Sequence, residues 1–429
     1  MTENASRPSP LADSVGDYWH LAVKLLTGYH MPFRDRVFDS LIGNAGIPLM
    51  SVEISDHDGE PHNAVLDAAK ELEAWQSRNS GSRIENTEIV VPFYSGCEGP
   101  VESVPPGTQV AMKTARITLL GTSDSHEVPR DGSVGSSTDI RGAAGRDPDR
   151  PDAGPTWSSG SLAQYSHGGG KALERLLGTG NTRGFSWSGT TVDPLDAVSL
   201  DSFTKAADAI DRAARFFRER HRDLDTWEFE PGTDDAARRG DAAAEFRELV
   251  HGLHRTYRRY SEDLPMAGVV DSRYGNDLRR FRDDLRAAAA VLYDSWSVWQ
   301  EFSGNPLRWL HDLLMEVTQN VWLHNIAKVR YDGGVEGRDS PLGLMTGSHK
   351  VASEGFHGGD PSYGALEDPA TWKRIGTTAV DRWRKSADEQ LGRAGMRALR
   401  HVRHSRRDRT SAPPATTYAC RHDRKQAGA

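Results

Sequence analysis

Paired histidines are the residues of this chain whose types and spacing could do chemistry. His401 and His404 lie three positions apart, so a helix would place both on one face, where two imidazoles can ligate zinc. No glutamate in the metalloprotease pattern accompanies them, and neither does a third ligand. We therefore expect two polar surface histidines among arginines, and the sequence predicts no metal site and no cofactor.

A second group of histidines stands in a stretch rich in glycine and serine. His349, His357 and Asp360 could form a hydrolase site, but loops with this composition are common, so this is the last of the functional hypotheses. Gly168-Gly169-Gly170-Lys171 is similar to a phosphate-binding loop. It lacks the first glycine at the required distance, and Ala172 replaces the Ser or Thr that would follow the lysine. We assign no catalytic residue and expect a protein that is not an enzyme.

Positive charge gathers near the C-terminus. Residues 371–429 contain 15 Lys and Arg against 5 Asp and Glu, a net charge of +10, so the other 370 residues carry −18 in a chain of net charge −8. A helix over residues 393–409 would be lined by arginines that could neutralise phosphates: Arg397, Arg400, Arg403, Arg406 and Arg407. Weak nucleic-acid binding through this run is one alternative for the function.

The composition limits the class of protein. A length of 429 residues allows two or three domains, but a hydrophobic content of 37% predicts that part of the chain is unpacked. No run approaches the ~18 uncharged apolar residues that a membrane span needs. The opening residues lack the basic and apolar segments of a secretory signal, and Cys97 and Cys420 suggest no disulfide framework. We expect a cytoplasmic protein, or one secreted without a cleavable signal peptide.

The clearest structural pattern lies between Asp201 and Leu264. Apolar residues recur there at alternating spacings of 4 and 3 in two runs, and each run predicts one apolar stripe on a helix. Pro231-Gly232 separates the runs, and Asp234 or Asp235 could cap the second helix. We predict an antiparallel helical hairpin in which His221 occupies a core position. Its expected interface consists of Phe203, Ile210, Phe217, Leu224, Phe246, Val250, Leu253, Tyr257 and Tyr260.

Shorter patterns before the hairpin predict a small α+β module at residues 13–122. The expected helices are Asp13 or Asp17 to Tyr29, Pro32–Leu41 and 63–78, and the expected strands are 47–55, 87–94 and 108–121. Residues 123–170 have the composition of a disordered insert. Residues 171–195 should return to the module through a short helix and a last strand at 185–192.

Two further helices, 276–302 and 306–330, repeat the 4-and-3 spacing, so residues 196–330 predict a helical hairpin and a four-helix bundle. Their tryptophans, Trp296, Trp299, Trp309 and Trp322, should pack in the core or between helices. Residues 331–368 should be a Gly-rich loop, 369–404 a cationic helix and 405–429 a disordered tail. The expected fold class is α+β: a small N-terminal α/β module followed by a long antiparallel helical hairpin or four-helix bundle, with a disordered insert and tail.

The hairpin, together with the segment Asp234–Phe246, resembles the actinobacterial AAWKG family. That family is similar to the WXG-type helical-hairpin proteins exported by type VII secretion. The residues that match its motif are Ala236, Ala237, Arg238, Arg239 and Gly240, with Arg238 in the place of Trp and Arg239 in the place of Lys. Asp17–Ile54 also resembles the opening of the family. The resemblance covers residues 13–400 without the insert, and it implies a non-enzymatic protein that is exported or related to assembly.

These observations favour a helical-hairpin interaction protein whose helices pair with a helical protein partner or with themselves. It would be exported by type VII secretion or associated with it. One alternative is the delivery portion of a toxin that has lost its C-terminal effector. Another is a nucleic-acid-binding protein that acts through the basic C-terminal tail.

Overall fold

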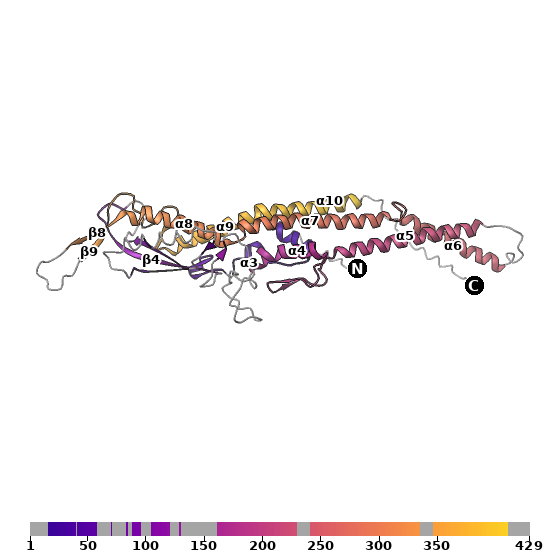
Figure 1. The fold of residues 1–429 in the computed structure, drawn as a ribbon, viewed down its shortest axis with the longest axis horizontal. Helices are drawn as coiled ribbons and strands as arrows, with labels where there is room; N and C mark the ends of the chain where they lie inside the picture. Colours follow the sequence, from indigo (N-terminus) through magenta and orange to yellow (C-terminus); the bar gives the residue numbers. More distant parts are fainter. Residues whose placement is uncertain are drawn as a thin grey trace, which may run out of the picture. The chain divides into compact units, whose positions relative to one another are not determined.

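The chain divides into two compact units, which are described separately. The computed structural model describes residues 16–39, 41–57, 70, 83–84, 88–95, 104–120, 128–129, 161–229, 241–334 and 346–410. Unit 1 comprises Met1–Asp201 and Ala289–Met396, and unit 2 comprises Ser202–Ala288 and Arg397–Ala429. The fold is α+β, with long helices and an antiparallel sheet, as the sequence predicts (Figure 1).

An antiparallel sheet of five strands lies in unit 1. Its strands are β1 (Met50–Asp56), β3 (Glu88–Ser95), β4 (Gln109–Leu119), β8 (Val329–Gly334) and β9 (Thr346–Val351). The central strand β4 pairs with β1, β3 and β9, and β9 also pairs with β8. In β4 the side chains of Val110, Met112, Ala115, Ile117 and Leu119 are buried. This near-alternating pattern leaves one face of the strand on the core, as expected for a half-buried strand.

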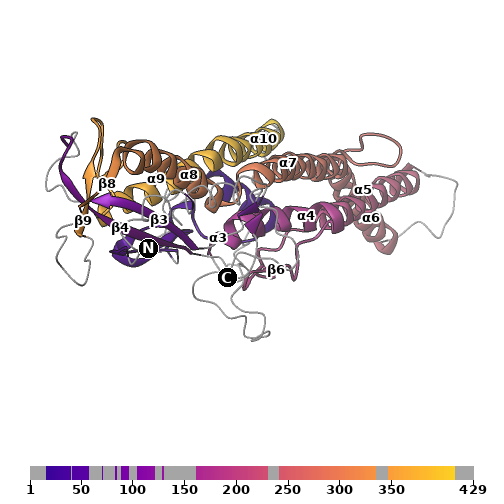
Figure 2. The same cartoon turned by 60° about the vertical axis from the view of Figure 1, so that its left-hand side comes forward.

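Among the helices of unit 1, α8 and α9 lie side by side next to the sheet, and α1 packs against α4 (Figures 1 and 2). The helices of this unit include α1 (Tyr18–Thr27), α3 (Ser161–Ala163), α4 (Gly169–Thr179), α8 (Pro306–His324) and α9 (Pro369–Ala387). A π-helical turn, Gln164–Gly168, joins α3 to α4, and a second, Asp388–Gly392, joins α9 to α10 (Arg393–Thr410). Four tryptophans of the described part of unit 1 are fully buried: Trp19, Trp299, Trp372 and Trp383.

Unit 2 is built from three long helices and the last part of α10. Helix α5 (Leu200–Phe229) enters it from unit 1, α6 (Asp241–Asp263) lies wholly within it, and α7 (Arg273–Ser303) leaves it. These bounds agree with the predicted hairpin and with the helix expected at 276–302. The predicted breaker, Pro231-Gly232, lies outside the described residues.

The N-terminal elements are largely as expected. Asp17 caps α1 by accepting a hydrogen bond from the amide of His20, and Gly28 ends the helix in the left-handed conformation. The three strands predicted at 47–55, 87–94 and 108–121 are confirmed as β1, β3 and β4. The helix predicted at Pro32–Leu41 is wrong, since only Arg34–Arg36 forms a 3-10 turn. The helix predicted at 63–78 falls almost wholly outside the described residues.

Several loop predictions are also wrong. Residues 331–368 contribute β8 and β9 to the sheet, and a small ladder of β10 (Gly359–Asp360) with β11 (Gly364–Ala365). Short strands that carry glycine and polar residues do not show the apolar alternation on which the prediction depended. The strand predicted at 185–192 is a two-residue hairpin of β6 (Ser186–Trp187) with β7 (Thr190–Thr191), and it does not join the five-stranded sheet.

The predicted insert at 123–170 ends earlier than expected. Residues 161–170 are helical and buried, because Leu162 and Tyr165 supply apolar surface and the three glycines let aromatic rings approach the helix. A Cβ atom at Gly168 would overlap the ring of Tyr29, and one at Gly170 would overlap the indole of Trp296. The short strand β5 (Val128–Pro129), paired with β2 (Arg83–Ile84), also falls within the predicted insert.

The four-helix bundle predicted for residues 196–330 is not confirmed. Helix α8 ends at His324 rather than at Arg330, and it packs against α9 in unit 1. Trp296 and Trp299 are buried and Trp309 is half-buried, but Trp322 is exposed, contrary to the prediction. The helix predicted to end at residue 404 continues as α10 to Thr410, and the rest of the predicted tail lies outside the described residues.

Candidate interaction surface

Helices α5 and α6 form an antiparallel pair held by aromatic side chains. The ring of Phe217 lies 5.6 Å from that of Tyr257 and 4.8 Å from that of Tyr260. The imidazoles of His221 and His254 stack with 4.7 Å between centroids and 11° between planes. Residue numbers rise along α5 as they fall along α6, so the helices run in opposite directions. His221 is half-buried against α6, at the core position predicted for it.

The other end of α5 contacts α7 instead of α6. The ring of Phe203 lies 5.5 Å from that of Phe281, and the guanidinium of Arg282 donates to the Thr204 hydroxyl. The prediction that Phe203 lies in the interface between α5 and α6 is therefore wrong. The reason is length, because α6 has 23 residues against 30 in α5, so the first turns of α5 extend past the end of α6.

The buried carboxylate of Asp211 links α5 to Ser272, just before α7, and to Arg279 in α7. Asp211 Oδ1 accepts hydrogen bonds from the amide and hydroxyl of Ser272, and Asp211 Oδ2 lies 2.7 Å from Arg279 Nη2. Burial raises the pKa of Asp211, but the hydrogen bonds from Ser272 and Arg279 outweigh this effect and lower it below its usual value. Asp211 is therefore a structural anion.

The predicted interface residues divide into two groups. Leu224 and Val250 are buried, and Ile210, Phe217 and Tyr257 are half-buried, as expected for an interface. Phe246, Leu253 and Tyr260 are 65%, 40% and 46% exposed. Tyr260 contacts Phe217 while its other edge meets solvent, but Phe246 and Leu253 were wrongly predicted to be buried.

The error at Phe246 and Leu253 has a geometric cause. The row that faces α5 is Val250, His254 and Tyr257, whose spacing is also 4 and 3. At about 100° per residue, the mean direction of Phe246, Leu249 and Leu253 lies about 75° round the helix from that of the facing row, so these side chains lie at the edge of the contact. Helix α6 thus carries two apolar rows, and only one of them covers α5.

The outward row includes Leu249, which the sequence reasoning missed and which is 60% exposed. Its spacing could have identified it, because Phe246, Leu249 and Leu253 are separated by 3 and 4 residues, as on one face of a helix. On α5, Phe216 and Trp227 are exposed as well, and Phe216 contacts Tyr257. The hairpin therefore presents large apolar side chains to solvent on both helices.

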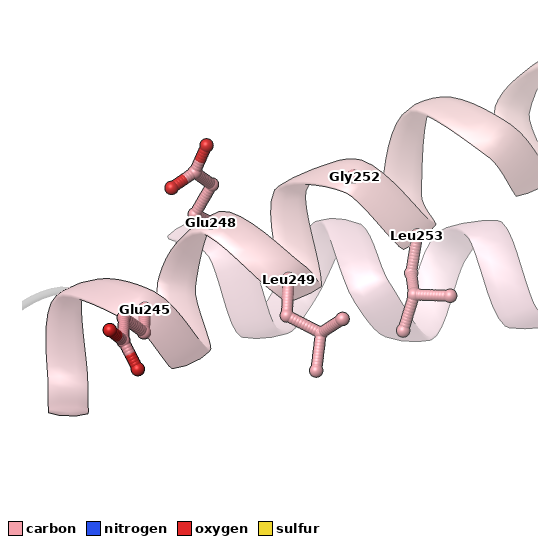
Figure 3. Close-up of a pocket in the computed structure, with 5 residues that line it drawn as sticks. All are labelled: Glu245, Glu248, Leu249, Gly252 and Leu253. Carbon is pink, nitrogen blue, oxygen red and sulfur yellow. The ribbon is translucent and has the colours of Figure 1, made fainter. Parts of the chain in front are cut away.

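A shallow depression lies on α6 at the centre of this outward surface (Figure 3). Its volume is about 430 Å³. Figure 3 shows the side chains of Leu249 and Leu253 pointing to the same side of the helix, with Glu248 pointing to the opposite side. The depression forms where Gly252 leaves the backbone uncovered. Its lining residues are Glu245, Glu248, Leu249, Gly252 and Leu253.

The residues considered for hydrolysis contact aromatic rings, a side-chain amide and backbone amides. His349 is buried on β9 between the rings of Tyr94 and Tyr331, at 5.0 and 5.3 Å. Asp360 accepts hydrogen bonds from Asn320 and from two backbone amides of its own turn. The ring of His357 lies 5.9 Å from that of His324. These partners indicate that Asp360 organises a turn.

Several arginines of α10 have exposed side chains. Arg397, Arg400 and Arg403 are exposed, and His401 Nε2 lies 3.8 Å from the Asp284 carboxylate of α7. Arg406 and Arg407 belong to the last turns of the same helix. Among the residues with described positions, no three His, Cys, Asp or Glu side chains lie close enough to hold a metal ion.

The motif residues Ala236, Ala237, Arg238, Arg239 and Gly240 lie outside the described residues. No helix in the described part of the chain is both long and apolar enough to cross a membrane. No protein-family model matches the sequence, and no curated protein and no solved structure matches the chain.

Proposed function

We propose that this chain is a non-enzymatic interaction protein that binds a helical protein through the outward surface of the α5–α6 hairpin. The observation that supports the proposal is the second apolar row of α6. Phe246, Leu249 and Leu253 are exposed, although burying each such side chain would yield about 1.5–3 kcal/mol. Exposed apolar side chains that line up on one helix face are characteristic of binding surfaces.

A photo-crosslinking amino acid placed at Leu249 tests this proposal in cells that express the full chain. We expect crosslinked adducts at position 249. Arg247 is the matched control, because it is exposed on the same helix but lies about 160° round from Leu249. Equal adduct formation at both positions, or none at 249, would contradict a specific surface.

Export is a further part of the proposal, and its support is the resemblance to the type VII hairpin proteins. Comparing culture supernatant with cell lysate in the native host, with and without its type VII ATPase, tests it directly. Appearance outside the cell that depends on the ATPase is the expected result. Retention in the cell under both conditions would contradict export but would leave the interaction surface intact.

Nucleic-acid binding is a second candidate, favoured by the exposed Arg397, Arg400 and Arg403 of α10. Its test is the double variant Arg400→Glu with Arg403→Glu, with retention on duplex DNA measured at several salt concentrations. Each phosphate contact contributes about one unit to the slope of log affinity against log salt, so loss of two contacts should lower that slope by about two. An unchanged slope would exclude these arginines as the contacts.

A further inference from the structure

The outward row of α6 has the spacing of a helix-packing seam. Phe246, Leu249 and Leu253 are separated by 3 and 4 residues and are exposed. Tyr260 follows seven residues later and is 46% exposed, although its ring also contacts Phe217 of α5. This is the spacing of the a and d positions of a heptad, which match a second helix that carries the same repeat. The row spans 14 residues, or about 21 Å at 1.5 Å per residue, which is long enough for four helical turns of contact.

Gly252 lies between Leu249 and Leu253 in the sequence of α6. A glycine in a helix interior costs about 1 kcal/mol relative to alanine. A Cβ atom at this position would meet nothing within 4 Å, so packing inside the chain does not require glycine there. The absence of a side chain creates the depression in Figure 3 and lets another backbone approach closely.

The charges beside the row differ between the two halves of the helix. The exposed charged side chains of residues 244–253 have a net charge of −1, and those of residues 254–263 have a net charge of +1. They are Glu245, Arg247 and Glu248 in the first half, and Arg255, Arg258, Arg259, Glu262 and Asp263 in the second. If two copies of α6 lie antiparallel about Leu253, the acidic half of each meets the basic half of the other. A parallel pair would place like charges opposite each other. The surface is therefore complementary to itself in the antiparallel orientation.

We infer that the outward face of α6 binds the same face of a second copy of this chain, with the two α6 helices antiparallel and crossing at Gly252 and Leu253. In this arrangement Phe246 of one copy lies opposite Tyr260 of the other. The inference rests on the proposed function, because it names the partner of the same hairpin surface. The contact is isologous, so it closes as a dimer.

Sedimentation equilibrium of the full-length protein tests the inference. The expected result is a mass that rises from one chain to two with concentration. Gly252→Leu should raise the dissociation constant more than about tenfold, because its side chain fills the crossing point. The same change should leave the monomer intact, since leucine favours a helix more than glycine does and a Cβ atom at this position meets no neighbour.

Gly178→Leu is the matched control, because Gly178 is an exposed glycine of α4 with no atom within 4 Å of a would-be Cβ. It should leave the dissociation constant unchanged. A monomeric mass for the wild type at every concentration would overturn the inference, as would a Gly252→Leu protein that dimerises as tightly as the wild type. Circular dichroism of each variant confirms that any loss of dimer occurs in a folded chain.

Cysteine crosslinking tests the orientation, in a background in which Cys97 and Cys420 are replaced by Ser. A mixture of Phe246→Cys and Tyr260→Cys chains should form a mixed disulfide, whereas Phe246→Cys chains alone should not. A disulfide requires Cα atoms within about 7 Å, which the antiparallel pair allows only for the mixture. Self-crosslinking of Phe246→Cys would overturn the antiparallel arrangement.

The two proposals can fail separately. If the wild type is monomeric while the crosslinker at Leu249 still captures a different protein in cells, the second copy is excluded and the interaction function is supported. If position 249 forms no adducts in cells and the wild type is monomeric, both are excluded.

Discussion

Arg279 Nη2 on α7 lies 2.7 Å from Asp211 Oδ2 on α5, and the same nitrogen lies 2.7 Å from Asp208 Oδ1. The Asp211 carboxylate is buried, while the guanidinium of Arg279 is partly exposed. Replacing Arg279 with Ala would leave Asp211 without its ionic partner, although the hydrogen bonds from Ser272 would remain. The ion pair therefore joins α5 to α7 through the buried carboxylate of Asp211.

Arg279→Ala should lower the free energy of unfolding of unit 2 by about 2 kcal/mol, less than a fully buried pair because Arg279 meets solvent. Amide hydrogen exchange in α5 and α7 measures the loss in this unit alone. Arg220→Ala is the matched control, because Arg220 pairs with Asp223 on the surface of α5. Such exposed pairs contribute at most about 1 kcal/mol. If both variants lose the same free energy of unfolding, the ion pair of Asp211 with Arg279 stabilises unit 2 no more than an exposed pair does.

Gly170→Ala should destabilise unit 1, because the added Cβ would overlap the indole of Trp296 and force α4 or the ring to move. We expect a loss of about 1–3 kcal/mol, as for other overpacked cores. Gly178→Ala in the same helix meets no neighbour and should instead stabilise the chain by about 0.5–1 kcal/mol. Urea denaturation of the two variants measures both effects. Losses of the same size would indicate that α4 does not pack closely on Trp296.

The two glycines show how far the sequence could predict the fold. Periodicity located α5, α6, α7, β1, β3 and β4, because each carries a regular apolar pattern. It could not locate the helix at 161–170, where glycines are required by the approach of Tyr29 and Trp296 from distant segments. Composition alone cannot distinguish a glycine needed for close packing from one in a loop.

The interaction surface was predictable only in part. The 4-and-3 spacing identified α6 as a packing helix but could not choose between two overlapping rows, one through Val250 and one through Phe246. That choice depends on the rotation of α6 against α5, which the contacts of Phe217 and His221 determine. Similarly, β8 and β9 are short, and they belong to the sheet only because β9 pairs with β4 and β8 pairs with β9.

His167 should make the stability of unit 1 depend on pH. Burial, together with Lys171, lowers its pKa to about 3 in the folded chain, against 6.5 for an ordinary histidine. Between these values the unfolded chain binds the proton and the folded chain does not. The free energy of unfolding should therefore fall as the pH drops below about 6.5, by at most about 1.4 kcal/mol per pH unit, and should be unaffected by this group above that pH.

Urea denaturation of wild type and His167→Gln between about pH 7 and pH 5 measures this contribution. Glutamine does not titrate, so the variant should lose less stability than the wild type over this range. Other acidic groups, and the buried His20, titrate in both proteins and cancel in the comparison. If the free energy of unfolding falls equally with pH in both proteins, His167 does not cause the loss of stability in acid.

Phe217 and Leu253 should respond differently to the same substitution, although the sequence predicts both in one interface. Phe217→Asp would introduce a charge between the rings of Tyr257 and Tyr260, and should destabilise the α5–α6 pair by about 3 kcal/mol or more. Leu253→Asp changes a side chain that is 40% exposed on the outward row, so its charge would stay hydrated and the helicity should be retained. Circular dichroism and hydrogen exchange of α6 distinguish the two outcomes. If Leu253→Asp melts the hairpin as strongly as Phe217→Asp, the row through Phe246 and Leu253 packs inside the hairpin and cannot be a surface for a partner.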